Sequence, residues 1–144
     1  EVHRVVGNGQ IILFTYDPVM ISSFWLTKYF PSFIKDVETT FIPIPKLSDE
    51  ISLVTGNSVN VSPFRLPHNL SDSFAAVGWA RPELYLDINI RNGISSFAKI
   101  DGDEVEQGVL RLKEDLETGR WDKEYGYLRK QKQYDVGYRF VVSK

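Results

Sequence analysis

The sequence predicts an α/β fold, and three observations lead to that prediction. A short strand is predicted at residues 10–16, with an apolar run from Ile11 to Phe14 and Tyr16 just beyond it. A strand without a polar face is covered on both sides, as in a parallel sheet. Two further strand patterns follow at residues 58–66 and 136–142, and helical stretches separate all three. Three strands make a poor independent sheet, so the first strand is expected to need a further neighbour.

Composition and charge limit the classes of function. With 42% hydrophobic and 25% charged residues, the 144-residue chain is typical of a globular domain or of part of one. Its formal net charge of −2 offers no general attraction to nucleic acid or to an anionic membrane. No apolar run approaches the roughly 18 residues of a membrane span, and the absence of cysteine excludes disulfide and thiolate chemistry. We therefore expect a cytoplasmic protein with neither nucleic-acid nor membrane partners.

The first part of the chain predicts a strand followed by two short helices. Residues 1–6 have the pattern of a last helical turn closed by Gly7, and the strand at residues 10–16 comes next. From residue 19 to 37, apolar residues recur at helical spacing, and Pro31 interrupts them. Helices that are apolar around so much of their circumference lie in a core or face a ligand cavity.

The next part predicts an extended segment, a helix and a strand. Residues 41–45 are expected to be extended, because each of the two prolines restricts the residue before it. A short helix through Val54 follows, and residues 58–66 alternate as a strand. Pro63 cannot donate a ladder hydrogen bond, which favours an edge position for this strand.

The remaining residues predict a helical segment, 67–134, and a closing strand within 135–144. In the helical segment, Asp101 and Glu104 have the spacing of a capping box, and Gly119 stops the helix that they open. The apolar stripe of this helix consists of Val105, Val109, Leu112 and Leu116. A stripe on one face with charged residues opposite is typical of an amphipathic helix packed on a core.

Several motifs of catalysis and binding are absent from the sequence. His3 and His68 lie far apart, and neither has a partner at metal-ligand spacing, so no metal site is predicted. No Gly-x-Ser-x-Gly elbow and no phosphate-binding Gly-x-x-x-x-Gly-Lys-Ser/Thr loop occurs. Gly7 and Gly9 have the spacing that opens a dinucleotide-binding loop. They follow a helix and precede a strand, however, so we interpret them as a turn.

Five segments of the chain resemble one enzyme family. They are EVHRVVGNGQIILFT (residues 1–15), WARPELYLD (79–87), GISSFA (93–98), LRLKEDLETGRWD (110–122) and DVGYRFVV (135–142). The first is similar to the junction before the fifth strand of class I, Rossmann-like S-adenosylmethionine-dependent methyltransferases. The other four are similar to the carboxyl-terminal part of a bacterial group of these enzymes, the methyltransferase type 11-like group.

The resemblance covers nearly all of this chain but only about the second half of the family domain. It implies that residues 1–66 supply the fifth and sixth strands and that residues 135–144 supply the last, inserted antiparallel between them. It also implies that residues 67–134 are a helical insertion over the substrate side. The resemblance further implies that the complete enzyme uses S-adenosylmethionine. The glycine-rich loop and the acidic residue that hold this cofactor in the family have no counterpart here. This chain alone is therefore expected neither to bind the cofactor nor to methylate an acceptor.

Two candidate functional residues lie at the carboxyl end of the first strand, where open α/β sheets bind ligands. Tyr16 is a candidate substrate contact. Asp17 is a candidate general base, and the alternative is that it caps the helix that follows. No cofactor-binding residue is predicted.

Further candidates come from the aromatic run and from the insertion. His68 is a candidate base or a surface loop residue. Arg81 is a candidate contact for an anionic substrate, and the alternative is that it pairs with a nearby carboxylate or carbonyl. The aromatic candidates for an acceptor pocket are Phe24, Trp25, Tyr29, Phe30 and Trp79. For the first four, core packing is the alternative.

Two functions of different classes follow from these observations. The first is a substrate-side portion of a methyltransferase that binds a small-molecule acceptor and covers the active site. The second is a non-catalytic α+β module for binding or oligomerisation. The uncovered edge of the first strand is expected to promote self-association.

Overall fold

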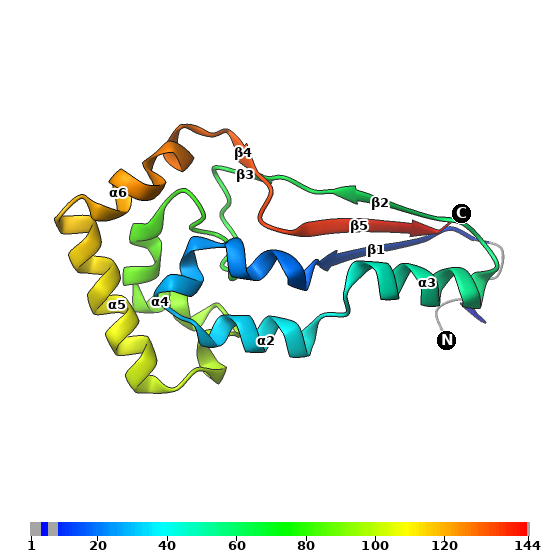
Figure 1. The fold of residues 1–144 in the computed structure, drawn as a ribbon, viewed down its shortest axis with the longest axis horizontal. Coiled ribbons are helices and arrows are strands. Elements are labelled where there is room, and N and C mark those ends of the chain that lie inside the picture. Colours follow the sequence, from blue (N-terminus) through cyan, green and yellow to red (C-terminus); the bar gives the residue numbers. More distant parts are fainter. Residues whose placement is uncertain (1–3, 6–8, 144) are drawn as a thin grey trace.

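The computed structural model describes residues 4–5 and 9–143. The main sheet consists of β1 (Ile11–Tyr16), β2 (Val59–Pro63) and β5 (Tyr138–Ser143). The strand order is β1-β5-β2, with β5 antiparallel to both neighbours (Figure 1). This confirms the predicted position of the last strand, and β2 lies at an edge, as its Pro63 predicts. The predicted helix end over residues 1–6 and Gly7 lies outside the described residues, apart from residues 4–5, which are helical.

Helix α3 (Ile44–Thr55) begins earlier than predicted. Pro43 is its N-cap residue and Pro45 lies in its first turn, where the N–H that proline lacks has no partner within the helix in any case. The prediction that residues 41–45 are extended is therefore wrong for the last two of them. The helix ends at Gly56 in the left-handed conformation, with φ of 72°.

One face of the main sheet is only partly covered in the part of the chain that the structure describes: it is open at Ile12 and Phe14 and covered at Tyr16. The register places Phe14 opposite Phe140, and residues that face each other in a ladder share a face of the sheet. On this face Ile12 is 57% exposed and Phe14 is 52% exposed. On the other face, the Thr55 hydroxyl of α3 lies 3.2 Å from the Ser143 hydroxyl. The prediction that both faces of the first strand are covered is therefore wrong for the described residues.

Helices occupy the rest of the molecule. Between β1 and α3 lie two 3-10 helices, η1 (Pro18–Ser23) and η2 (Trp25–Lys28), and α2 (Ser32–Thr40). A short ladder of β3 (Leu66–Pro67) and β4 (Gln133–Tyr134) closes the helical insertion at its base. The insertion contains η3 (Pro82–Leu86), α4 (Ile88–Asn92), η4 (Phe97–Lys99), α5 (Gly102–Glu117), α6 (Arg120–Tyr125) and η5 (Gly126–Lys130). In Figure 1, α5 and α6 lie at the end of the molecule opposite α3.

Helix α5 is anchored at its start to the chain that follows β1. The Asp101 side chain accepts a hydrogen bond from the Asp103 N–H and caps the helix, as predicted. Glu104 does not complete the capping box, because its carboxylate accepts from the Ser32 N–H at 2.9 Å. One turn further on, Gly108 is buried against Phe30. Helix α5 therefore packs closely on the segment between η2 and α2.

The core between η2 and the insertion is built from tryptophan and tyrosine rings. The Trp25 Nε1–H donates to the Trp79 carbonyl at 2.9 Å, and the Trp25 ring meets the Trp121 ring edge to face, with centroids 5.2 Å apart. The Tyr85 hydroxyl donates to the Ala75 carbonyl at 2.7 Å. These rings are buried, and their polar atoms fix how the insertion sits on the rest of the chain.

Candidate acceptor cavity at the end of the sheet

The cavity begins where the chain leaves β1. Tyr16, the last residue of the strand, is only 5% exposed, and its ring lies 5.2 Å from that of Tyr138 and 5.7 Å from that of Phe41. Gly137 has φ of 123°, and a Cβ there would lie 2.8 Å from both the Tyr16 ring and the Met20 Cβ. A glycine is therefore required at this position, both by its backbone conformation and by the close approach of Tyr16.

A cavity of about 190 Å³ lies beside Tyr16, at the junction of the sheet, α2 and the insertion. Its lining consists of Tyr16, Ile21, Phe24, Phe33, Asp36, Val37, Thr40, Phe41, Phe74, Ala75, Ala76, Ser95, Ser96, Lys99 and Tyr138. Residues 74–76 and 95–99 come from the insertion, which thus forms one wall. A small apolar cavity with a few polar groups is typical of a ligand site.

The polar part of the lining is an ion pair with hydroxyl neighbours. Lys99 Nζ donates to Asp36 Oδ1 at 2.6 Å, across the gap between α2 and η4. Burial opposes the charge on Asp36, but hydrogen bonds from Lys99 and Ser96 together outweigh it and hold the pKa of Asp36 below its ordinary value. The carboxylate is therefore ionised at neutral pH, and its charge is balanced by Lys99.

Two tyrosine hydroxyls of the lining stay protonated at neutral pH. Burial, with a smaller effect of Tyr138, raises the pKa of Tyr16, and burial raises the pKa of Tyr138 to about 12. Both hydroxyls are therefore neutral hydrogen-bond donors. The Tyr16 hydroxyl is buried and has no hydrogen-bond partner among the described residues.

Of the residues predicted from the sequence, Tyr16 and Phe24 line this cavity. Asp17 lies just outside it and acts as the N-cap of η1, with its Oδ1 3.4 Å from the Val19 N–H. The capping alternative thus describes the contact that Asp17 makes. His68 also lies away from the cavity. Its ring meets that of Trp79 edge to face with centroids 5.8 Å apart, and its backbone N–H donates to the Lys132 carbonyl.

The other predicted aromatic residues lie together in the core and not at the cavity. Trp79 Nε1–H donates to the Pro67 carbonyl at 3.1 Å, and Trp25 donates to Trp79. Arg81 donates to the Leu70 carbonyl at 2.7 Å. Of the two roles considered for Arg81, this contact is the pairing with a nearby carbonyl. These contacts tie the insertion to its own base, and the structure brings Trp25, Trp79 and His68 together as one packed group.

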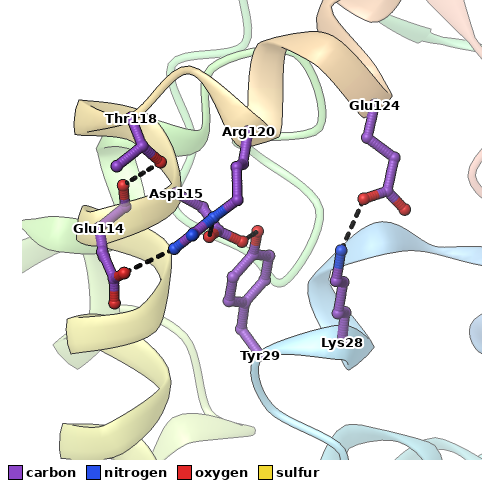
Figure 2. Close-up of polar contacts among 7 residues, drawn as sticks. All are labelled: Lys28, Tyr29, Glu114, Asp115, Thr118, Arg120 and Glu124. Atoms are coloured by element: carbon purple, nitrogen blue, oxygen red, sulfur yellow. Dashed lines mark hydrogen bonds and ion pairs between the residues drawn. The ribbon is translucent and has the colours of Figure 1, made fainter.

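Tyr29 belongs to a polar cluster between η2, α5 and α6 (Figure 2). Its hydroxyl donates to Asp115 at 2.7 Å, and burial together with this hydrogen bond raises its pKa. Arg120 donates to the same carboxylate at 2.6 Å, and Lys28 donates to Glu124 at 2.6 Å. Each charged side chain of this cluster faces one of opposite sign, as Figure 2 shows. The cluster therefore holds the insertion against the segment after β1.

Several lining residues were not predicted from the sequence. Asp36 and Lys99 have no pattern that joins them, because they lie on separate elements that only the fold brings together. Phe74 and Ser96 sit in short irregular segments without periodicity. Tyr138 is the residue that could have been predicted to line the cavity. It lies opposite Tyr16 once the closing strand is placed beside the first strand in this register.

The described residues give no sign of a metal centre or of a membrane helix. Within residues 4–5 and 9–143, no group of three or more His, Cys, Asp or Glu side chains is placed to hold a metal ion. None of the helices in the same ranges has the length and hydropathy that crossing a bilayer requires.

Acid is expected to weaken the Asp36–Lys99 contact at the cavity. Because the pKa of Asp36 is lower in the folded state than the value of about 3.9 in an unfolded chain, the pair stabilises the fold above about pH 4 and this contribution is lost as the pH falls through the folded-state pKa. The loss is about 1 kcal/mol at most, since Lys99 is half exposed. Urea titrations from about pH 3 to 7 should show a smaller acid slope for Asp36→Asn than for the wild type. If stability falls equally steeply in acid for the wild type and for Asp36→Asn, the Asp36–Lys99 pair does not stabilise the fold as described.

Comparisons with known proteins give one informative match. No family model and no curated protein matches this chain. A crystal structure of a presumed methyltransferase from an antibiotic biosynthesis pathway of Anabaena variabilis superposes on it with a TM-score of 0.88 and 41% sequence identity. The match covers 95% of this chain and 55% of that one. This chain therefore spans about half the length of the Anabaena protein, and over that half it is similar to a methyltransferase in both sequence and fold.

Proposed function

We propose that this chain is the carboxyl-terminal, substrate-side portion of a class I, S-adenosylmethionine-dependent methyltransferase of the bacterial type 11-like group. The observation that carries the proposal is the match of 95% of the chain, at 41% identity, to just over half of a presumed methyltransferase. The strand order β1-β5-β2, with β5 antiparallel, supports it, because the family resemblance implies this arrangement for the last three strands. A cytoplasmic location is part of the same proposal.

The cofactor belongs to the part of the enzyme that this chain does not span. A cavity of about 190 Å³ is too small for a nucleoside joined to an amino acid, and the family's glycine-rich loop is missing from the sequence. The residues of this cavity therefore do not fit S-adenosylmethionine, and we assign no residue of this chain to the cofactor. When bound by the complete enzyme, the cofactor supplies the methyl group.

The role of this chain is to hold the acceptor and to exclude water. Tyr16 and Phe24 contact the acceptor in the cavity at the end of β1, and the insertion closes the cavity from one side. Holding the acceptor in one orientation lowers the barrier, because positioning two reactants supplies much of the rate of a group transfer. Trp25, Tyr29, Trp79 and Arg81 support this role indirectly, since their contacts fix the insertion in place.

A chimera provides the test of this proposal. In it, the matched 55% of the Anabaena protein is replaced by this chain. Isothermal titration calorimetry is expected to show S-adenosylmethionine binding to the chimera and to the parent protein, with dissociation constants within about tenfold, a difference of about 1.4 kcal/mol. The chain alone is expected to give no binding heat. Tight binding by the chain alone, or none by a folded chimera that keeps the parent's secondary structure, would contradict the proposal.

One observation favours the second candidate, a non-catalytic module for binding or oligomerisation. The open sheet face carries Phe14, Phe64 and Phe140 in mutual ring contact, with centroids 5.0–5.5 Å apart. Exposed apolar surface of this kind is typical of an interface, and the unpaired edge of β1 supports self-association in the same way. In the methyltransferase proposal, the missing part of the enzyme covers this surface. The chimera distinguishes the two, because only the methyltransferase proposal expects it to bind the cofactor.

A further inference from the structure

We propose that the cavity beside Tyr16 binds an uncharged, single-ring aromatic group of the acceptor, with an oxygen or nitrogen on the ring that accepts a hydrogen bond from Tyr16. The assignment of this group to a methyl acceptor rests on the proposed function. The binding itself rests on the size, the lining, the charge and the unsatisfied hydroxyl of the cavity.

The size of the cavity fits one ring. A cavity of about 150 Å³ lined by apolar side chains holds a benzene molecule, and this cavity has a volume of about 190 Å³. The additional volume accommodates one or two substituent atoms. A fused two-ring system with substituents, or a nucleoside, exceeds it.

The lining favours an aromatic group over an aliphatic one. Phe24, Phe41 and Phe74 reach the cavity from three separate segments of the chain, and Phe74 already meets Tyr138 edge to face with centroids 5.6 Å apart. Aromatic rings attract one another in edge-to-face and offset arrangements beyond the burial of their surface. A planar ring in the cavity gains such contacts on several sides at once.

The charge of the lining excludes an ionised ring. Asp36 and Lys99 are the charged residues of the lining, and they balance each other in a direct ion pair. A carboxylate or ammonium group on the ligand would lose its hydration without gaining an unpaired partner of opposite charge, which is strongly unfavourable. The cavity therefore selects a neutral group.

The polar contact comes from Tyr16. Its hydroxyl is buried, protonated at neutral pH and without a hydrogen-bond partner among the described residues. Buried polar groups in folded proteins are nearly always paired, and an unpaired one at a cavity indicates a water or a ligand atom that completes it. A phenol oxygen or a ring nitrogen within hydrogen-bond distance of this hydroxyl meets the requirement.

Fluorine NMR with small probes tests the proposal on the 144-residue chain. We expect para-fluorophenol to bind with a dissociation constant on the order of 1 mM, the range for a ligand of so few atoms. Para-fluorobenzoate, which has a similar size and a negative charge, should bind at least about tenfold more weakly, because its charge is left unpaired. Fluorobenzene serves as the probe without a hydrogen-bonding oxygen.

Two variants locate the binding. Tyr16→Phe should weaken para-fluorophenol binding about five- to tenfold, the value of one hydrogen bond to a buried group, and should leave fluorobenzene binding nearly unchanged. Ala76→Leu fills the cavity and should weaken both probes. Circular dichroism shows whether each variant of the isolated chain folds. If a variant does not fold, the same substitution is measured in the chimera.

Each outcome decides the proposal. Equal binding of para-fluorobenzoate overturns the selection of a neutral group, and an equal effect of Tyr16→Phe on para-fluorophenol and fluorobenzene overturns the role of the hydroxyl. Failure of all probes to bind folded protein overturns the whole inference. Because cofactor binding by the chimera is measured separately, a chimera that binds para-fluorophenol but no S-adenosylmethionine contradicts the proposed function and leaves the cavity assignment standing.

Discussion

Gly108→Ala is expected to lower the free energy of unfolding by about 3 kcal/mol, at the upper end of the cost of overpacking a core. A Cβ at this position of α5 would lie 2.4 Å from Phe30 Cε1 and 2.5 Å from the Tyr29 carbonyl oxygen. Phe30 is fully buried and is packed edge to face on Phe97, with centroids 4.9 Å apart, so it has no room to move. The helix must shift away from the core to admit one methyl group.

The matched control is Gly102→Ala at the start of the same helix. No heavy atom lies within 4 Å of a Cβ at Gly102, and alanine loses less conformational freedom than glycine on forming a helix. This variant should be neutral or stabilising by up to about 1 kcal/mol. Urea unfolding followed by far-ultraviolet circular dichroism measures both. If the two variants shift the midpoint by the same amount, the close packing of α5 on Phe30 is wrong.

Trp25→Phe is expected to destabilise the fold by about 3 kcal/mol, and the same change at Trp121 by about 1–2 kcal/mol less. Both indole rings are buried and lose similar volume. Trp25 Nε1–H donates to the Trp79 carbonyl, so its removal leaves a buried acceptor without this partner. Trp121 Nε1–H is buried with no partner among the described residues, so its removal relieves an unsatisfied donor.

Arg129 modifies the comparison only slightly. Its guanidinium carbon lies 4.8 Å from the centroid of the Trp121 ring, and phenylalanine keeps much of this cation–π contact, which is worth about 0.5–1 kcal/mol in total. Equilibrium unfolding of both variants in urea gives the difference directly. A Trp121→Phe variant that is as unstable as Trp25→Phe would show that the two N–H groups have equivalent surroundings.

The positions of the strands could be predicted from the sequence, but which part of the protein packs on each face of the sheet could not. Alternation and apolar runs gave β1, β2 and β5 to within a few residues, and the family resemblance gave their order. An apolar strand, however, does not indicate which polypeptide covers it. Ile12 and Phe14 have the pattern of a strand buried on both faces, yet one face is open in the described part of this chain.

The cavity could be predicted only in part, because hydrophobic patterns do not distinguish a core from a ligand site. Phe24 and Trp25 are neighbours in the sequence, with the same burial and the same propensities, yet only Phe24 lines the cavity. The difference arises from the side on which the insertion packs, and that depends on contacts such as the one between Lys99 and Asp36, which are 63 residues apart. Long-range contacts of this kind leave no local signal.

The position of β5 in the middle of the main sheet has a consequence for synthesis of the protein. Within the described residues, both β1 and β2 hydrogen-bond to β5 and not to each other, so this three-stranded sheet forms only after residues 138–143 have left the ribosome. Until then, β1 and β2 lack this shared partner, while the insertion, which is rich in short helices, is expected to form its local contacts first. The main sheet is thus completed late in synthesis, and a fragment that ends before residue 138 is expected to leave the edges of β1 and β2 that pair with β5 open to other chains.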